Sequence, residues 1–101
     1  MNVVEIPISS AASHFMQEND VFGQTLSLEF MWIETEGFWL LHIHDGREEP
    51  LEFGIKLQPD WPLFIDHQAG FALMLFSRTQ GQIPHRATLK DRFVLVAYET
   101  V

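Results

Sequence analysis

The sequence contains no cysteine among its 101 residues, and this absence removes a whole group of chemistries. Disulfides, thiolate-bound zinc, iron–sulfur clusters and cysteine nucleophiles are excluded, because each of them needs a thiol. Basic residues are also scarce: six Lys and Arg stand against 14 Asp and Glu, which gives a formal net charge of −8. Because neutralising a phosphate backbone takes clustered Lys and Arg, we expect no nucleic acid partner.

Long apolar runs are missing as well. The longest, residues 71–76 and 93–98, are far shorter than the ~20 residues that a membrane-spanning helix needs. The first eight residues lack the positive region of a signal peptide, and Glu5 interrupts their apolar stretch. We therefore expect a soluble protein without a membrane partner, and we read the N-terminus as a first strand.

The apolar content that is present is enough for one core. Hydrophobic residues make up 47% of the chain and aromatic residues 13%, too much for a disordered segment. A chain of this length buries roughly 65% of its unfolded surface on folding, which leaves room for a single core. The composition thus predicts one domain over residues 1–101.

Alternating side chains predict strands in the first half of the chain. Residues 24–32 place apolar side chains at every second position, the period of a half-buried strand. The pattern breaks at residues 34–37 and resumes over residues 38–44, which predicts a hairpin. The dipeptide Asp45-Gly46 suits a second tight turn, after which residues 51–57 form the return strand.

The second half of the chain also predicts strands. Residues 71–77 and 92–99 predict strands, and residues 88–91 a single helical turn between them. Residues 59–62 predict a loop or corner, because two prolines remove two backbone donors.

Residues 9–20 leave two interpretations open: a short capped helix, or a loop that leads into a short strand around residues 14–17. About six to seven short strands, without the helical patterns that parallel sheets require, predict an all-β antiparallel fold. A small barrel or a tight sandwich would fit this pattern.

Two of the predicted strands are apolar on both faces. Residues 71–76 and 93–98 do not alternate, although an antiparallel strand with one solvated face should do so. Something should therefore cover their outer faces. The cover is either the domain's own loops and N-terminal segment or another protein subunit.

A pair of histidines raises the possibility of a metal site. His42 and His44 stand two residues apart, which places both imidazoles on one face of a strand. Together with Gly37, Glu48 and Gly54 they resemble the first metal motif of the cupin barrels, although the spacing on each side is one residue short and no second motif follows. Two imidazoles and the Glu48 carboxylate would suit Zn, Mn or Fe. The simpler interpretation places these histidines on the polar face of an edge or interface strand.

Other functional signals are weaker. The serines lack a Gly-x-Ser-x-Gly elbow, the glycines form no phosphate-binding loop, and the acidic pairs are typical of solvated turns. Trp61 suggests a platform for a peptide or a carbohydrate, or else a plug at the end of the barrel, which we favour. We therefore expect no catalytic, cofactor-binding or metal-binding residues, and no enzyme.

The order of the strand and turn patterns resembles one family, the small plug proteins in the baseplates of contractile-tailed bacteriophages, such as those of cyanophages. The similar stretches are residues 6–8, 26–32, 39–45, 54–57 and 93–99, with Leu63, Pro84 and Leu89 between them. The resemblance implies a non-enzymatic β-barrel domain of the virion, made in the host cytoplasm. It also implies several symmetric copies in the tail baseplate that contact tube, hub or spike proteins. The runner-up is a cupin-like metal protein that uses His42, His44 and Glu48, and a third possibility is a binding module centred on Trp61.

Charge is unevenly distributed along the chain. Residues 1–46 contain seven acids and no Lys or Arg, whereas residues 78–92 contain four bases and a single acid. If the fold separates these segments, unlike surfaces would orient the subunit between unlike neighbours.

Overall fold

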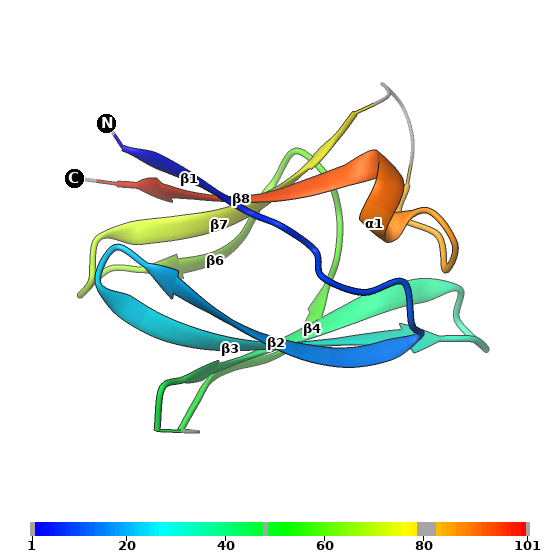
Figure 1. Ribbon diagram of the computed structural model, residues 1–101, viewed down its shortest axis with the longest axis horizontal. Coiled ribbons are helices and arrows are strands. Elements are labelled where there is room, and N and C mark those ends of the chain that lie inside the picture. Colours follow the sequence, from blue (N-terminus) through cyan, green and yellow to red (C-terminus); the bar gives the residue numbers. More distant parts are fainter. Residues whose placement is uncertain (1, 48, 79–82, 101) are drawn as a thin grey trace.

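The structure is a computed structural model that describes residues 2–47, 49–78 and 83–100. These residues form two facing four-stranded sheets with one short helix at one end (Figure 1). In chain order the elements are β1 (Val3–Ile6), β2 (His14–Val21), β3 (Gln24–Ile33), β4 (Phe38–Asp45), β5 (Pro50–Lys56), β6 (Pro62–Asp66), β7 (Phe71–Ser77), α1 (Leu89–Arg92) and β8 (Phe93–Glu99). Sheet A has the order β1-β8-β7-β6, and sheet B has the order β2-β3-β4-β5.

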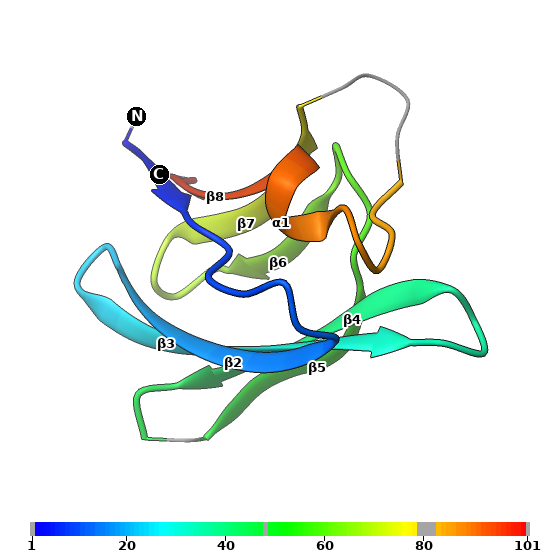
Figure 2. The same ribbon diagram turned by 45° about the vertical axis from the view of Figure 1, so that its right-hand side comes forward.

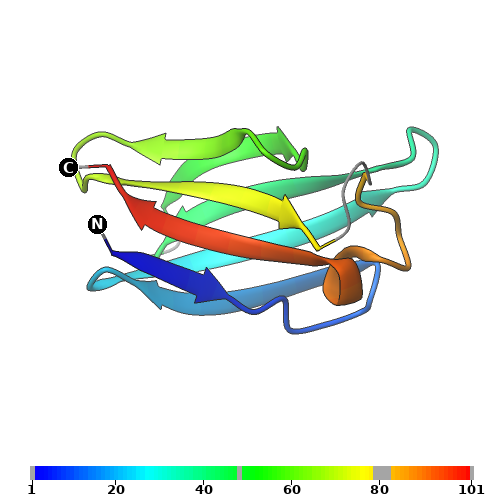
Figure 3. The same cartoon turned by 90° about the horizontal axis from the view of Figure 1, so that it is seen from above.

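The all-β antiparallel prediction is confirmed, and of its two forms the sandwich is the correct one. The described strands pair within sheet A or within sheet B, and no pairing joins the two sheets into a closed barrel. Figure 2 shows the two separate layers from the side, and Figure 3 shows from above how the strands of sheet A lie over those of sheet B. The described residues thus form an open sandwich of eight strands, and the barrel, which the sequence left as the other possibility, is not formed.

The core lies between the two sheets. The apolar positions of β3, Leu26, Leu28 and Phe30, are fully buried, as their alternation predicts. They face residues of sheet A such as Leu73 and Leu95, which are also inaccessible to solvent. Burial of large apolar side chains on both inner faces is the main source of stability in a sandwich of this size.

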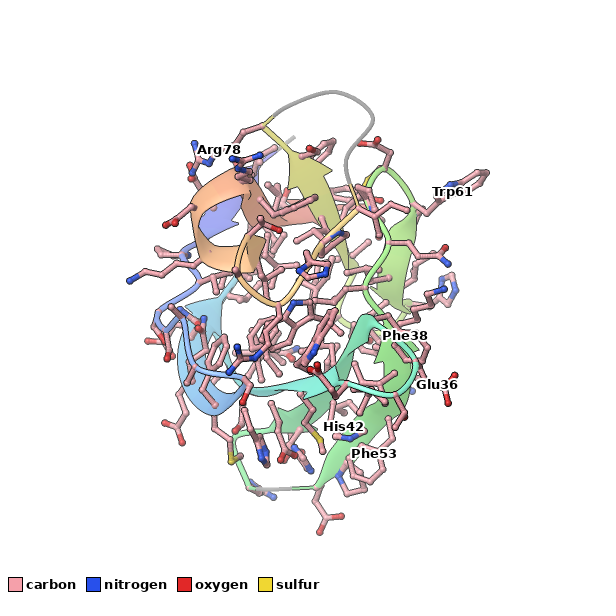
Figure 4. The ribbon with its side chains drawn as sticks, turned by 90° about the vertical axis from the view of Figure 1, so that its right-hand side faces the viewer. Glu36, Phe38, His42, Phe53, Trp61 and Arg78 are labelled. Atoms are coloured by element: carbon pink, nitrogen blue, oxygen red, sulfur yellow. The ribbon has the colours of Figure 1, made fainter. Side chains whose placement is uncertain are left out.

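One end of the sandwich is filled by Trp39. Its indole is buried, and its Nε1 donates a hydrogen bond of 2.9 Å to the backbone oxygen of His85. The Trp32 ring lies edge-on to Trp39 at 5.8 Å and also contacts the His85 ring at 5.2 Å. The prediction that Trp61 would plug an end of the domain is wrong, because its side chain is 68% exposed and points away from the body (Figure 4).

The segment that the sequence left open forms β2, a strand of eight residues rather than a helix. Its inward-facing positions include polar side chains, so the sequence does not show the apolar–polar alternation of a half-buried strand. Gln17 is one of these polar side chains. Its Nε2 donates to the Pro7 oxygen at 2.9 Å, and its Oε1 accepts from the Ser9 amide at 2.9 Å. The side chain thus holds the connection from β1 across the open side of the sandwich.

The predicted corner at residues 59–62 is present, but it leads directly into an unpredicted strand. Asp60 adopts a positive φ of 70° and its amide donates to the Leu75 oxygen at 2.8 Å, which fastens the corner beside β7. Pro62 then opens β6, where a missing amide is tolerated because β6 is an edge strand of sheet A.

The two ends of the chain lie side by side at one end of sheet A (Figure 1). β1 pairs with β8 in a register that sets Val3 opposite Tyr98. Beyond the strands, the Asn2 side-chain amide donates to Glu99 Oε1 at 3.0 Å, and the Glu99 backbone amide donates to the Asn2 oxygen at 3.1 Å.

Candidate functional site

His42 and His44 lie together on the outer face of β4, as their spacing predicts. Phe53 of the neighbouring strand stands edge-on to both imidazoles, with ring centroids 5.0 Å from each. Figure 4 shows His42 and Phe53 pointing away from the core on the same side of sheet B. The two histidines are therefore packed against an aromatic ring.

A bulge in β5 creates this arrangement. Leu41 pairs with Ile55 and Ile43 with Glu52, so Phe53 and Gly54 together oppose His42 alone. Gly54 has a φ of 70°, and its amide donates to His42 Nδ1 at 2.9 Å. Because Nδ1 accepts this bond, the neutral His42 ring carries its proton on Nε2.

Replacing Gly54 with Ala should destabilise the fold by about 1–2 kcal/mol, since a side chain is disfavoured at this φ. A Cβ at this position would have no neighbouring atom within 4 Å, so crowding does not contribute. Gly54→Asn should cost less, because Asn tolerates the left-handed region. Urea unfolding of the wild-type protein and the two variants measures the difference, and equal stability of the wild type and Gly54→Ala would contradict the strain.

The proposed metal set is incomplete in the part of the chain that the structure describes. Glu48, the expected third ligand, lies outside the described residues. Within them, no group of three or more His, Asp or Glu side chains is arranged to hold a metal ion. His44 Nδ1 is buried, and none of the described residues offers it a hydrogen bond.

The outer face of sheet B is polar and acidic around these histidines. Glu18 and Asp20 of β2 are exposed, and Glu29 of β3 pairs with His14, with 2.5 Å between His14 Nε2 and Glu29 Oε2. A shallow hollow on this face is lined by Met16, Ser27, Glu29 and His44. Three of its four lining side chains can hydrogen-bond to water, whereas Met16 and the neighbouring Phe53 are apolar side chains that are more than half exposed.

The outer face of sheet A has the opposite character. The strand registers set Val3 beside Tyr98, Met74 beside Val96 and Phe76 beside Val94. A shallow apolar depression runs over these strands and is lined by Val3, Met74, Phe76, Val96 and Tyr98. We call these five residues, together with Ile65 of β6, the sheet A outer face.

This face is open to solvent. Val3 is 61% exposed, Ile65 44% and Phe76 39%. In the described residues, neither the connections nor the N-terminal segment covers them. The loops that the structure describes therefore do not account for the two-sided apolar strands, and the other explanation, a partner protein, is favoured.

Basic side chains gather at the end of sheet A that carries α1. Arg78 follows β7, and its amide donates to the Arg92 oxygen at 2.8 Å, so the two arginines are neighbours at this end. Lys90 lies on α1 itself. The acidic turn that contains Glu36 belongs to sheet B and lies apart from Arg78 in the end-on view of Figure 4.

Comparison with known proteins assigns this sandwich to a family. The model of one protein family, described as the cyanophage baseplate Pam3 plug gp18, matches residues 3–100. The chain belongs to this family. No curated protein matches it. The resemblance to phage baseplate plugs is thus confirmed, and the family is one of structural baseplate components in the virion tail. In the described residues, no helix is long and apolar enough to cross a membrane.

The sequence did not reveal two of the features found here. Phe53 was part of a predicted strand, but a bulge rather than simple alternation brings it between the histidines. The glycine beside it was the available signal, since an isolated Gly within a strand pattern often marks a bulge. The sequence left open whether the domain's own loops or another protein subunit covers the outer face of sheet A.

Proposed function

We propose that this chain is a single structural domain, over residues 1–101, of a phage tail baseplate. It acts as a plug that packs against tube, hub or spike proteins by surface complementarity. Several symmetric copies are made in the host cytoplasm and built into the virion. The match of the family over residues 3–100 carries this proposal.

The two outer faces support a role in contact rather than in chemistry. One is a flat apolar sheet surface, and the other is polar, with its histidines packed against Phe53. The apolar face is suited to contact with a neighbouring protein, because an exposed apolar sheet surface on a small domain typically marks an interface. We therefore propose a non-enzymatic protein without cofactor, metal or nucleic acid.

Quantitative mass spectrometry of purified phage particles tests the proposal. With isotope-labelled peptides as standards, we expect the chain in every particle at a copy number that is a multiple of the tail's rotational symmetry. Electron cryomicroscopy should place the sandwich density in the baseplate. Particles that lack the chain altogether would contradict the proposed function.

Metal analysis tests the cupin-like alternative. We expect purified protein to hold no stoichiometric Zn, Mn or Fe, and its thermal midpoint to stay the same when EDTA is added. The packing of His42 and His44 against Phe53 and the Gly54 amide supports this expectation. Stoichiometric metal that disappears in both His42→Ala and His44→Ala would favour the alternative; Glu48→Gln would then test the third ligand.

A further inference from the structure

We propose that the sheet A outer face, together with Trp61 at its edge, is the surface by which this chain seats against a different baseplate protein. The partner's matching surface is uncharged and apolar. This inference rests on the proposed function and adds to it the side of the molecule that makes the contact and the chemistry of what it contacts.

The first argument is the placement of exposed apolar side chains. Val3, Ile65 and Phe76 all project from sheet A on the side away from the core. Trp61, the most exposed tryptophan of the described residues, stands at the corner beside the same sheet. A clustered apolar surface of this kind on a small domain typically marks an interface, and tryptophan is enriched among the residues that dominate binding energy.

The second argument is the near absence of charge on this face. Glu5 of β1 projects on the same side, and its carboxylate lies 3.8 Å from the Arg78 guanidinium at the rim. Both side chains are largely exposed, so this contact contributes little to stability. The charged groups of this pair lie at the rim, so the centre of the face is neutral. A partner that placed a charged group against the centre would remove that group from water without offering it a counter-charge. The complementary surface is therefore apolar.

The third argument concerns a second copy of this chain as the occupant. Strand spacing and rise give the face a width of about 20 Å and a length of about 23 Å, or roughly 450 Å². A stable, specific interface usually buries about 800 Å² on each partner. Two copies stacked face to face over this footprint would bury less than this area, and their formal net charges of −8 each would repel one another.

Trp61 favours a larger, concave partner instead. Figure 4 shows its side chain pointing sideways from the corner, away from the body of the sandwich. A second copy lying flat on sheet A would leave this indole in solvent. A neighbouring protein that also reaches around the β6 edge covers both the sheet A outer face and Trp61. The contact with Trp61 then adds the buried area that the face alone lacks.

Incorporation of variants into particles tests the surface. Phe76→Glu is compared with Met16→Glu, which places the same charge at an exposed apolar site on the outer face of sheet B. We expect Phe76→Glu to reduce the chain per particle about tenfold or more, and Met16→Glu to leave it near the wild-type level. Val3→Glu, at a more exposed position of the same face, repeats the test in case Phe76→Glu lowers the yield of folded protein. Circular dichroism of the purified variants verifies the fold.

Incorporation of folded Phe76→Glu and Val3→Glu at the wild-type level would overturn the assigned surface and would leave the proposed function intact. Absence of the wild-type chain from particles would overturn the function, and the inference with it. The two failures are therefore distinguishable within one experiment.

Photo-crosslinking identifies the occupant. A benzoylphenylalanine in place of Ile65 should crosslink, in assembled particles, to a baseplate protein of different sequence, identified by mass spectrometry. The same group in place of Met16 serves as the matched control on sheet B. A crosslink from position 65 to a second copy of this chain, or a stable dimer of the purified protein that Phe76→Glu dissociates, would overturn the choice of partner.

Discussion

Replacing Trp39 with Ala should lower the free energy of unfolding by about 3–5 kcal/mol. The indole is 1% exposed and lies between Trp32 and Phe15, with ring centroids 5.8 and 6.1 Å away. Its removal leaves a cavity and also leaves the His85 oxygen without its donor. Since domains of this size are stable by about 5–15 kcal/mol, this single change removes a large share of the total.

Trp61→Ala is the matched control for this prediction. The same side chain is removed from a site that is 68% exposed, so the expected change lies within about 0.5 kcal/mol. Urea unfolding monitored by far-ultraviolet circular dichroism measures both variants, with the slopes compared to ensure a common unfolded state. Similar losses in the two variants would contradict the assignment of Trp39 as the residue that fills the end of the core.

Leu95→Lys should abolish folding. Leu95 is fully buried on the inner side of β8, between Ile6 of β1 and Leu75 of β7 in the strand register. An ammonium group at this position has no carboxylate partner in the register and loses its hydration, a cost of several kcal/mol. We expect this variant to be recovered as insoluble or unfolded protein.

The next residue along β8 provides the control. Val96 faces outward and lies directly opposite Glu5, so a lysine there can extend its stem over the apolar face and place its charge near a carboxylate. Val96→Lys should therefore remain folded, with a stability within about 1 kcal/mol of wild type. Soluble yield and circular dichroism distinguish the two variants; the same outcome at positions 95 and 96 would contradict the alternation of β8.

Alternation made the fold class predictable where one face of a strand meets the core and the other meets water. β3 and β4 satisfy this condition, and their hairpin and the buried face of β3 follow from the sequence. For β2 the sequence left a short strand and a helix both open, because Gln17 occupies an inward position, where it hydrogen-bonds the backbone at Pro7 and Ser9 instead of packing in the core. A hydrogen-bonding role of this kind leaves no periodic signal.

The distinction between barrel and sandwich was not accessible for a related reason. It depends on whether edge strands pair across the gap, which is a property of long-range packing and not of any local pattern. Trp61 shows the same limit: composition favours a large aromatic in the core, but the bond from the Asp60 amide to Leu75 sets the corner so that the indole lies outside.

From the sequence it was predictable that the outer faces of β7 and β8 are covered, but not what covers them. Two-sided apolar strands indicated that something covers sheet A, and the exposed side chains of Val3 and Phe76 exclude the described loops as that cover. Which neighbour takes this place depends also on the shape and chemistry of that neighbour's own surface.

The pairing of the first strand with the last has a consequence for synthesis on the ribosome. Sheet B is drawn from one continuous stretch, residues 14–56, whereas sheet A needs β1 from the start of the chain and β8 from its end. During translation β1 remains without its partner until residues 93–99 have emerged. Contacts of such long sequence separation form late and slowly. We therefore expect sheet B to form first, and the apolar outer face of sheet A to be completed only after β8 has emerged.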